Sequence, residues 1–233
     1  MNRAQLGAIE MPPCIATNSN LISPFFNIGG EPGLIPNGTA ITITGEPGTG
    51  KTRYLLQVLQ NIAVFNKVPN FAFYSYEMGP GGLNRMLMDL DPNDQLNCNF
   101  TFSEDIDFKR NAVIGIDSLD EWALRNNSPY PTKEMAMQIK DAKERGCIIF
   151  QIHHRAKGKK LESGSALFPR QNDVTIELLK QGSDLVLATT RRKNRYAGQV
   201  DQIMLKHTDS GFVVHQGFDP KVMLQNLWTR ITT

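Results

Sequence analysis

Long apolar runs, cysteines and net charge are all scarce in this sequence, and each scarcity argues against a class of protein. The 233 residues include only three cysteines, widely spaced and without a C-x-x-C pair. A disulfide framework or a cysteine zinc site is therefore not expected. No apolar run is long enough to cross a bilayer, and residues 1–6 lack the apolar core of a signal peptide. We expect a cytoplasmic protein with reduced thiols and no membrane partner.

The net charge is only +2, but the charges are unevenly distributed. Between residues 155 and 195, ten Lys and Arg residues stand against four Asp and Glu residues. A basic segment on a near-neutral domain indicates contact with a polyanion, and a solvated surface run is the plainer alternative. Hydrophobic residues make up 40% of the chain, which is enough for the core of one α/β domain.

What the sequence does contain is a phosphate-binding loop of the form G-x-x-x-x-G-K-[ST]. Residues 40–44 before it alternate like a buried strand, and residues 54–63 after it carry apolar residues at helical spacing. Backbone N–H groups of such a loop point at phosphates. Lys51 would reach the β- and γ-phosphates of ATP, and the Thr52 hydroxyl would ligate Mg²⁺. The predicted nucleotide-binding residues are Gly45, Glu46, Pro47, Gly48, Thr49, Gly50, Lys51 and Thr52.

The rest of the chain is predicted to alternate strands and helices. We expect strands at 70–77, 99–103, 112–118, 147–153 and 184–190, helices at 83–90, 132–145 and 174–181, a basic turn at 191–198, a hairpin over 202–215 and a short helix within 220–233. This alternation predicts an α/β fold with a mostly parallel central sheet, helices on both faces and a C-terminal β-hairpin.

Ligands of such sheets bind beyond the carboxyl ends of the strands, and polar residues end several of the expected strands. Glu77 ends one strand and is the candidate to orient the attacking water, with an exposed surface glutamate as the alternative. Asp117 ends an apolar run in the manner of a Walker B aspartate, which holds Mg²⁺. Gln151, His153 or His154 could sense the γ-phosphate, although a buried histidine with satisfied hydrogen bonds is an equally good interpretation of each histidine.

Several motifs together resemble the RecA superfamily of ATPases. Residues 33–52 resemble the entry to the P-loop in its RadA and KaiC branches, and residues 74–78 are similar to the S-L-E-M stretch of DnaB-type helicases. Residues 154–157 stand where RadA has G-H-V-T-K. Residues 193–198 resemble the K-N-R-F-G motif of RadA. The zinc ribbon of RadA and the N-terminal domain of the helicases have no counterpart, so the chain also resembles the minimal RecA-like recombinases of phages.

The resemblance implies a RecA-like P-loop core that works as a homo-oligomer, ring or filament, with ATP at subunit interfaces. Glu77 would be the catalytic glutamate, and Lys193 and Arg195 would reach the nucleotide of the neighbouring subunit. Residues 1–27 are expected to form a lead-in arm, residues 28–216 the core and residues 217–233 a tail. A phage-encoded protein of this kind would work in the cytoplasm of its bacterial host.

The resemblance and the basic segment together indicate an ATPase acting on single-stranded DNA in recombination, repair or replication. The polar, Gly- and Ser-containing loop over residues 155–165 is the expected DNA contact. Its candidate DNA-binding residues are Arg155, Lys157, Lys159 and Lys160. Two alternatives stay open, a DnaB-like ring helicase motor and a KaiC-like regulatory ATPase with no DNA role.

Overall fold

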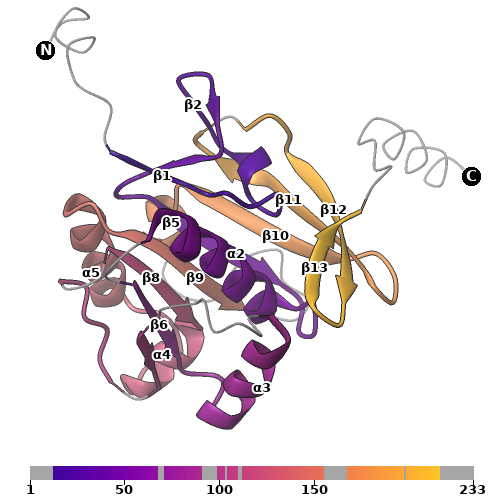
Figure 1. Cartoon of the computed structure of the whole chain (residues 1–233). Helices are drawn as coiled ribbons and strands as arrows, with labels where there is room; N and C mark the ends of the chain where they lie inside the picture. Colours follow the sequence, from indigo (N-terminus) through magenta and orange to yellow (C-terminus); the bar gives the residue numbers. More distant parts are fainter. Residues whose placement is uncertain are drawn as a thin grey trace, which may run out of the picture.

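The computed structural model describes most of the chain (Figure 1). The described residues are 13–67, 71–90, 99–102, 104–109, 112–154, 167–196 and 198–215. The expected DNA-binding loop and the expected C-terminal helix lie outside them. None of the helices in these ranges is long and apolar enough to cross a membrane.

A nine-stranded sheet forms the centre of the described structure, in the order β13-β12-β11-β10-β5-β9-β8-β6-β7. Its strands are β5 (Ala40–Gly45), β6 (Phe71–Ser75), β7 (Asn99–Thr101), β8 (Val113–Asp117), β9 (Ile148–His154), β10 (Val174–Lys180), β11 (Leu185–Asn194), β12 (Gln202–Thr208) and β13 (Gly211–Val214). The strands from β10 to β7 are parallel, whereas β11, β12 and β13 are antiparallel. The mostly parallel sheet and its closing hairpin are therefore confirmed.

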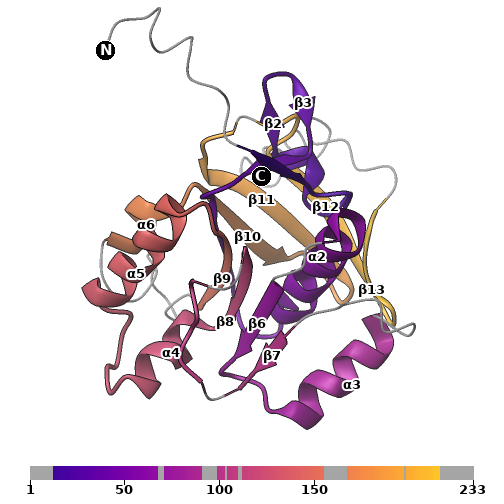
Figure 2. The same cartoon turned by 60° about the vertical axis from the view of Figure 1, so that its left-hand side comes forward.

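Helices cover both faces of this sheet, as predicted (Figure 2). The helices are α2 (Lys51–Asn66), α3 (Pro80–Leu90), α4 (Leu119–Arg125), α5 (Lys133–Glu144) and α6 (Leu167–Gln171). Successive side chains of a strand point to opposite faces, so neighbours such as Phe73 and Tyr74 belong to different apolar cores. Phe73 packs with the buried side of α2 and α3, and Tyr74 with that of α4, α5 and α6.

The segment before the P-loop strand contributes to the main core. It contains β1 (Cys14–Ala16), a 3-10 turn (Ser23–Phe25), β2 (Asn27–Ile28), β3 (Glu31–Pro32) and β4 (Leu34–Pro36). Leu21, Ile22, Phe25 and Phe26 are all buried in the core that contains α2. The carbonyl of Leu21 also accepts a hydrogen bond of 2.7 Å from the buried Tyr54 hydroxyl. Residues 13–27, expected to belong to an arm, are thus packed against the domain, while the boundaries of arm, core and tail stay a prediction.

Two expectations from the sequence are wrong. Residues 174–181 form strand β10 rather than a helix, because their alternating apolar side chains at 174, 176 and 178 all enter one core. Strand β10 pairs with β5 on one side and β11 on the other, so tertiary pairing overrides the helix-forming residues it contains. Residues 191–194, expected to be part of a turn, are the end of β11.

Candidate nucleotide-binding site

The carboxyl ends of four neighbouring parallel strands bring the P-loop, Glu77, Asp117 and His154 to one edge of the sheet. Strands β5, β9, β8 and β6 lie side by side and run in the same direction. The P-loop leaves β5 at Gly45, Asp117 ends β8, His154 ends β9, and Glu77 follows β6 by two residues. The order of the strands therefore brings together residues that are up to 109 positions apart in the sequence (Gly45 to His154).

The P-loop itself has a backbone that only glycine adopts easily. Gly48 and Gly50 have φ values of 77° and 83°, in the left-handed region. A Cβ atom on Gly50 would lie 2.8 Å from the Phe212 ring, whereas one on Gly48 would meet nothing within 4 Å. The loop is thus supported by β13 beneath Gly50 and open at Gly48, where a phosphate chain could lie at the N-terminus of α2.

Lys51 is held over this loop by two backbone carbonyls. Its Nζ donates hydrogen bonds to the carbonyl oxygens of Gly45 (3.1 Å) and Glu46 (3.0 Å), and the residue is 6% exposed. Burial lowers the pKa of the Lys51 ammonium, while Glu77, Asp117 and Asp120 oppose that change. The nearby carboxylates therefore favour the charged form that phosphate binding needs.

Thr52 and Asp117 form the second part of the site. Thr52 Oγ1 donates a 2.8 Å hydrogen bond to Asp117 Oδ2, and the Asp117 side chain is fully buried. Burial raises the pKa of Asp117 to about 6, with the Thr52 hydrogen bond acting in the opposite direction. Among the described residues, nothing hydrogen-bonds to Asp117 Oδ1.

A hydroxyl and a carboxylate with a free oxygen are ligands suited to Mg²⁺, which keeps waters and takes few protein groups. The described residues contain no group of three or more His, Cys, Asp and Glu side chains that could hold a metal alone. Thr52 and Asp117 are the described residues whose chemistry fits such an ion.

Glu77 is oriented by His154. Glu77 Oε2 lies 3.0 Å from His154 Nε2, and the Glu77 side chain is 47% exposed at the edge of the site. The hydrogen bond from His154 lowers the pKa of Glu77, and the same bond raises the pKa of His154. The backbone N–H of His154 in turn donates to Asp120 Oδ2 at 2.7 Å. Glu77 is therefore a charged carboxylate that His154 holds in place and that stays partly exposed to solvent near the P-loop.

The three candidate phosphate sensors occupy different environments. Gln151 is fully buried, and its amide donates to Thr42 Oγ1 (2.9 Å) and Asn172 Oδ1 (2.7 Å), away from the loop. His153 is also buried, with Nε2 3.6 Å from Asp120 Oδ1. His154 is the sensor candidate that contacts the candidate catalytic carboxylate, through its Nε2 and Glu77 Oε2.

Asp120 is a site residue that the sequence analysis did not identify. It lies in the first turn of α4, whose N-cap Ser118 accepts a hydrogen bond from the backbone N–H of Glu121. The spacing Ser-x-x-Glu at 118–121 is a capping signature that could have revealed this helix. No sequence pattern indicated that the Asp120 carboxylate would contact both His153 and His154.

Lys193 and Arg195 lie at the opposite edge of the sheet from the P-loop. Asn194 is level with Val174, which is level with Ile41 near the start of β5. Gly45, where the P-loop begins, lies four residues farther along β5, a rise of about 13 Å. Lys193 instead donates to the carbonyl of Arg170 (3.2 Å), and a lysine or arginine side chain at this place does not span the distance to the P-loop of its own chain.

Arg195 also has an acidic partner, which the sequence analysis did not expect. Its NH1 donates to Asp173 Oδ1 at 2.9 Å. Other cations of the basic segment are paired as well, Arg191 with Asp201 (2.8 Å) and Arg192 with Glu177 (3.1 Å). Part of the positive charge counted in the sequence is therefore neutralised within the chain. The candidate DNA-binding residues Arg155, Lys157, Lys159 and Lys160 lie outside the described residues.

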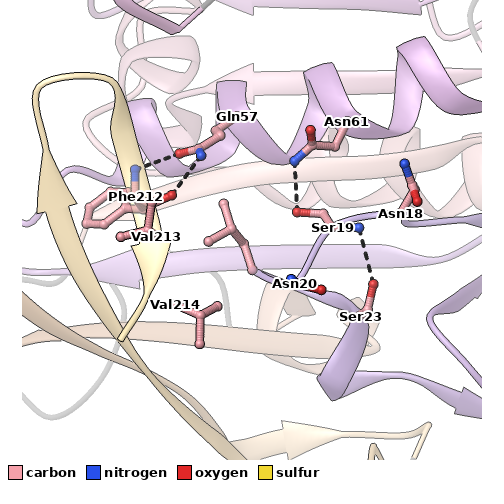
Figure 3. A pocket seen from close by; sticks show the side chains of 10 residues that line it. Asn18, Ser19, Asn20, Ser23, Gln57, Asn61, Phe212, Val213 and Val214 are labelled. Carbon is pink, nitrogen blue, oxygen red and sulfur yellow. Dashed lines mark hydrogen bonds between the residues drawn. The ribbon is translucent and has the colours of Figure 1, made fainter. Parts of the chain in front are cut away.

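A cavity of about 720 Å³ lies away from the nucleotide edge, between α2, β13 and the N-terminal segment (Figure 3). Gln57 bridges the backbone of Phe212 through two hydrogen bonds of 2.8 Å, and Asn61 donates to Ser19 Oγ at 3.0 Å. Its lining residues are Asn18, Ser19, Asn20, Leu21, Ser23, Gln57, Asn61, Phe212, Val213 and Val214. This described lining is made of uncharged polar and apolar side chains.

The central sheet in the described residues, with helices on both faces and a P-loop between β5 and α2, has the RecA-like α/β fold. Two solved structures share it. One is the flagellar accessory protein FlaH from Methanocaldococcus jannaschii, with a TM-score of 0.64 and 19% identity. The other is a KaiC-like protein from Pyrococcus horikoshii OT3, with a TM-score of 0.66 and 16% identity. Each alignment covers 88% of this chain and 99% of the other. No protein-family model and no curated protein matches the sequence.

Proposed function

We propose that this chain is a Mg-ATP-hydrolysing ATPase that binds its nucleotide at the interface between identical subunits. The observation that carries the proposal is the grouping of Lys51, the Thr52–Asp117 pair and Glu77 at one edge of the sheet. Hydrolysis of ATP needs a cation on the phosphates, ligands for Mg²⁺ and a carboxylate that orients water. All three kinds of group are present within one fold that is shared with P-loop ATPases.

In the proposed reaction, Lys51 exchanges its two backbone carbonyl partners for phosphate oxygens. Thr52 Oγ1 and Asp117 would hold Mg²⁺, which would supply positive charge to offset the charge of the phosphates. Glu77 orients a water molecule and takes its proton as the new bond to the γ-phosphorus forms and the bond to the bridging oxygen breaks. His154 keeps the Glu77 carboxylate directed during this step.

Lys193 and Arg195 are the residues proposed to act across the subunit interface. Their place at the far edge of the sheet supports a role toward a neighbour's nucleotide, because their own nucleotide is out of reach. Cationic side chains placed on the transferred phosphoryl group are worth about 10³–10⁵ in rate. A ring or a filament would supply such a neighbour to every site.

We further propose that the ATPase works on single-stranded DNA, in recombination, repair or replication. The support is the basic sequence of residues 155–165, which follows directly after His154, the last residue of β9. A ring helicase motor is the alternative within this class. A KaiC-like regulatory ATPase without a DNA role is supported equally well by the fold, since one structural neighbour is described as KaiC-like.

One experiment separates these functions. ATP turnover by the purified chain is measured with Mg²⁺, with and without single-stranded DNA, while the assembly size is followed by light scattering. Turnover that rises with DNA, together with a change in assembly size, is the expected result. Turnover and assembly that ignore DNA would favour the regulatory alternative, and an absence of Mg-dependent turnover in every condition would overturn the ATPase itself.

A further inference from the structure

Asp173 is a buried carboxylate placed directly before β10, at the edge of the sheet where Arg195 lies. Its side chain is 5% exposed and accepts three hydrogen bonds. Oδ2 accepts from the backbone N–H of Ala40 (2.9 Å) and from Lys143 Nζ (2.6 Å), and Oδ1 accepts from Arg195 NH1 (2.9 Å). Oδ2 of Asp173 thus connects the start of β5 to α5, and Oδ1 binds Arg195.

Neighbouring residues fix the backbone around Arg195, while its side chain stays partly exposed. The flanking Asn194 donates to the carbonyl of Phe25 (2.7 Å), and the Tyr196 hydroxyl lies 2.9 Å from Thr39 Oγ1. The Arg195 side chain is nevertheless 55% exposed. A guanidinium has five N–H donors in a rigid fork, so the contact with Asp173 leaves others available to a ligand outside the chain.

Lys193 converges on the same point. The carbonyl of Arg170 accepts hydrogen bonds from Lys193 Nζ (3.2 Å) and Arg195 NH2 (3.4 Å). The two charged groups are therefore held within reach of one oxygen, although they repel each other. The carboxylate of Asp173 is the buried negative charge that stabilises this arrangement.

We propose that Asp173 is a positioning residue that holds Arg195 of its own chain ready for the ATP bound by the neighbouring subunit. The inference rests on the proposed function and adds to it the group that orders the trans-acting side chain before the subunits meet. Ordering in advance removes the cost of immobilising a long side chain at the interface, about 0.5–1.5 kcal/mol for one such side chain. Loss of the ordering should therefore lower kcat about three- to tenfold and leave the KM for ATP unchanged, because the P-loop is untouched.

The test uses mixed assemblies in which only one kind of active site is complete. Lys51→Ala chains lack the phosphate-binding lysine but carry Arg195. Arg195→Ala chains carry an intact P-loop but lack Arg195. Where these chains co-assemble, shown by pull-down through a tag on one of them, a site is completed by Lys51 of one chain and Arg195 of the other. Asp173→Asn is then introduced into one partner at a time.

The expected result is asymmetric. Asp173→Asn should lower the recovered kcat about three- to tenfold when it shares a chain with Arg195, and should leave it unchanged in the chain that lacks Arg195. An equal loss in both arms, or no loss in either, overturns the proposal, because a merely structural role for Asp173 would not depend on the chain. Failure of the mixture to recover activity also overturns it.

Lys143→Met is the matched control, since it removes another partner of Asp173 while leaving the contact between Asp173 Oδ1 and Arg195. It should not reproduce the asymmetry. If Asp173→Asn does not fold, Asp173→Glu, which keeps the charge but displaces the carboxylate, is placed in the same two arms with the same criteria. A wild-type chain that fails to hydrolyse ATP would instead overturn the proposed function, so the two failures are distinguishable.

Discussion

Replacing Asp117 by asparagine should stabilise the ligand-free protein at neutral pH while removing a candidate Mg²⁺ ligand. Burial raises the pKa of this carboxyl from 3.8 to about 6. Between these two values the folded state binds more protons than the unfolded state, so the contribution of Asp117 to stability falls as the pH rises. The penalty is absent below pH 3.8 and complete above about pH 6. At about 1.4 kcal/mol per pKa unit, it amounts to about 3 kcal/mol.

The pH dependence separates this charge effect from any packing change caused by the amide. At pH 5 the folded carboxyl is mostly protonated, and roughly half of the penalty is present. The stability advantage of Asp117→Asn over the wild type should therefore grow by about 1–2 kcal/mol between pH 5 and pH 7.5. For a domain of this size, 1 kcal/mol corresponds to a change in Tm of about 2–4 °C.

The assay is thermal or urea unfolding of both proteins at the two pH values, with EDTA and without nucleotide. A stability difference that does not change with pH, or that shrinks as the pH rises, would refute the argument that Asp117 is a buried and destabilised charge. Addition of Mg-ATP at pH 7.5 should then raise the Tm of the wild type by more than that of Asp117→Asn, because a ligand stabilises the state that binds it.

Two other outcomes are expected from substitutions in the candidate binding residues. Lys51→Ala should abolish ATP binding in a fluorescent-nucleotide titration, because Lys51 supplies the fixed charge of the loop, and unchanged affinity would exclude it from the site. Simultaneous replacement of Lys157, Lys159 and Lys160 by alanine should weaken binding of single-stranded DNA and flatten the slope of log K against log salt by about 0.7 for each lost contact. ATP binding without DNA should survive in this triple variant, and an unchanged DNA affinity and slope would show that the loop is not the DNA contact.

The grouping of the P-loop, Glu77 and Asp117 at one edge of the sheet could be predicted because its information is local. A P-loop is one contiguous motif whose backbone makes the site. Asp117 ends a recognisable apolar strand, and Glu77 follows another by two residues. The rule that ligands bind beyond the carboxyl ends of parallel strands then brings these segments together without any knowledge of their contacts. The Thr52–Asp117 contact in the structure agrees with that expectation.

The structure of the segments that were predicted wrongly depends on contacts with residues far away in the sequence. Residues 174–181 contain Glu, Leu, Lys and Gln, which suit a helix, and only pairing with β5 and β11 makes them a strand. Polar residues around Leu21 and Phe25 conceal the apolar side chains that anchor the N-terminal segment. The partner of Arg195 lies 22 residues away at Asp173, and no local pattern links the two.

The proposed hydrolysis of ATP depends most directly on Glu77 as the residue that activates water at the site. ATP binding and single-turnover hydrolysis are measured separately on the wild type and on Glu77→Gln, which keeps the size and polarity of the side chain. We expect equal ATP affinity and hydrolysis slower by at least ~100-fold, as loss of a general base produces. Hydrolysis at the wild-type rate by Glu77→Gln would contradict the account and assign the reaction to another carboxylate.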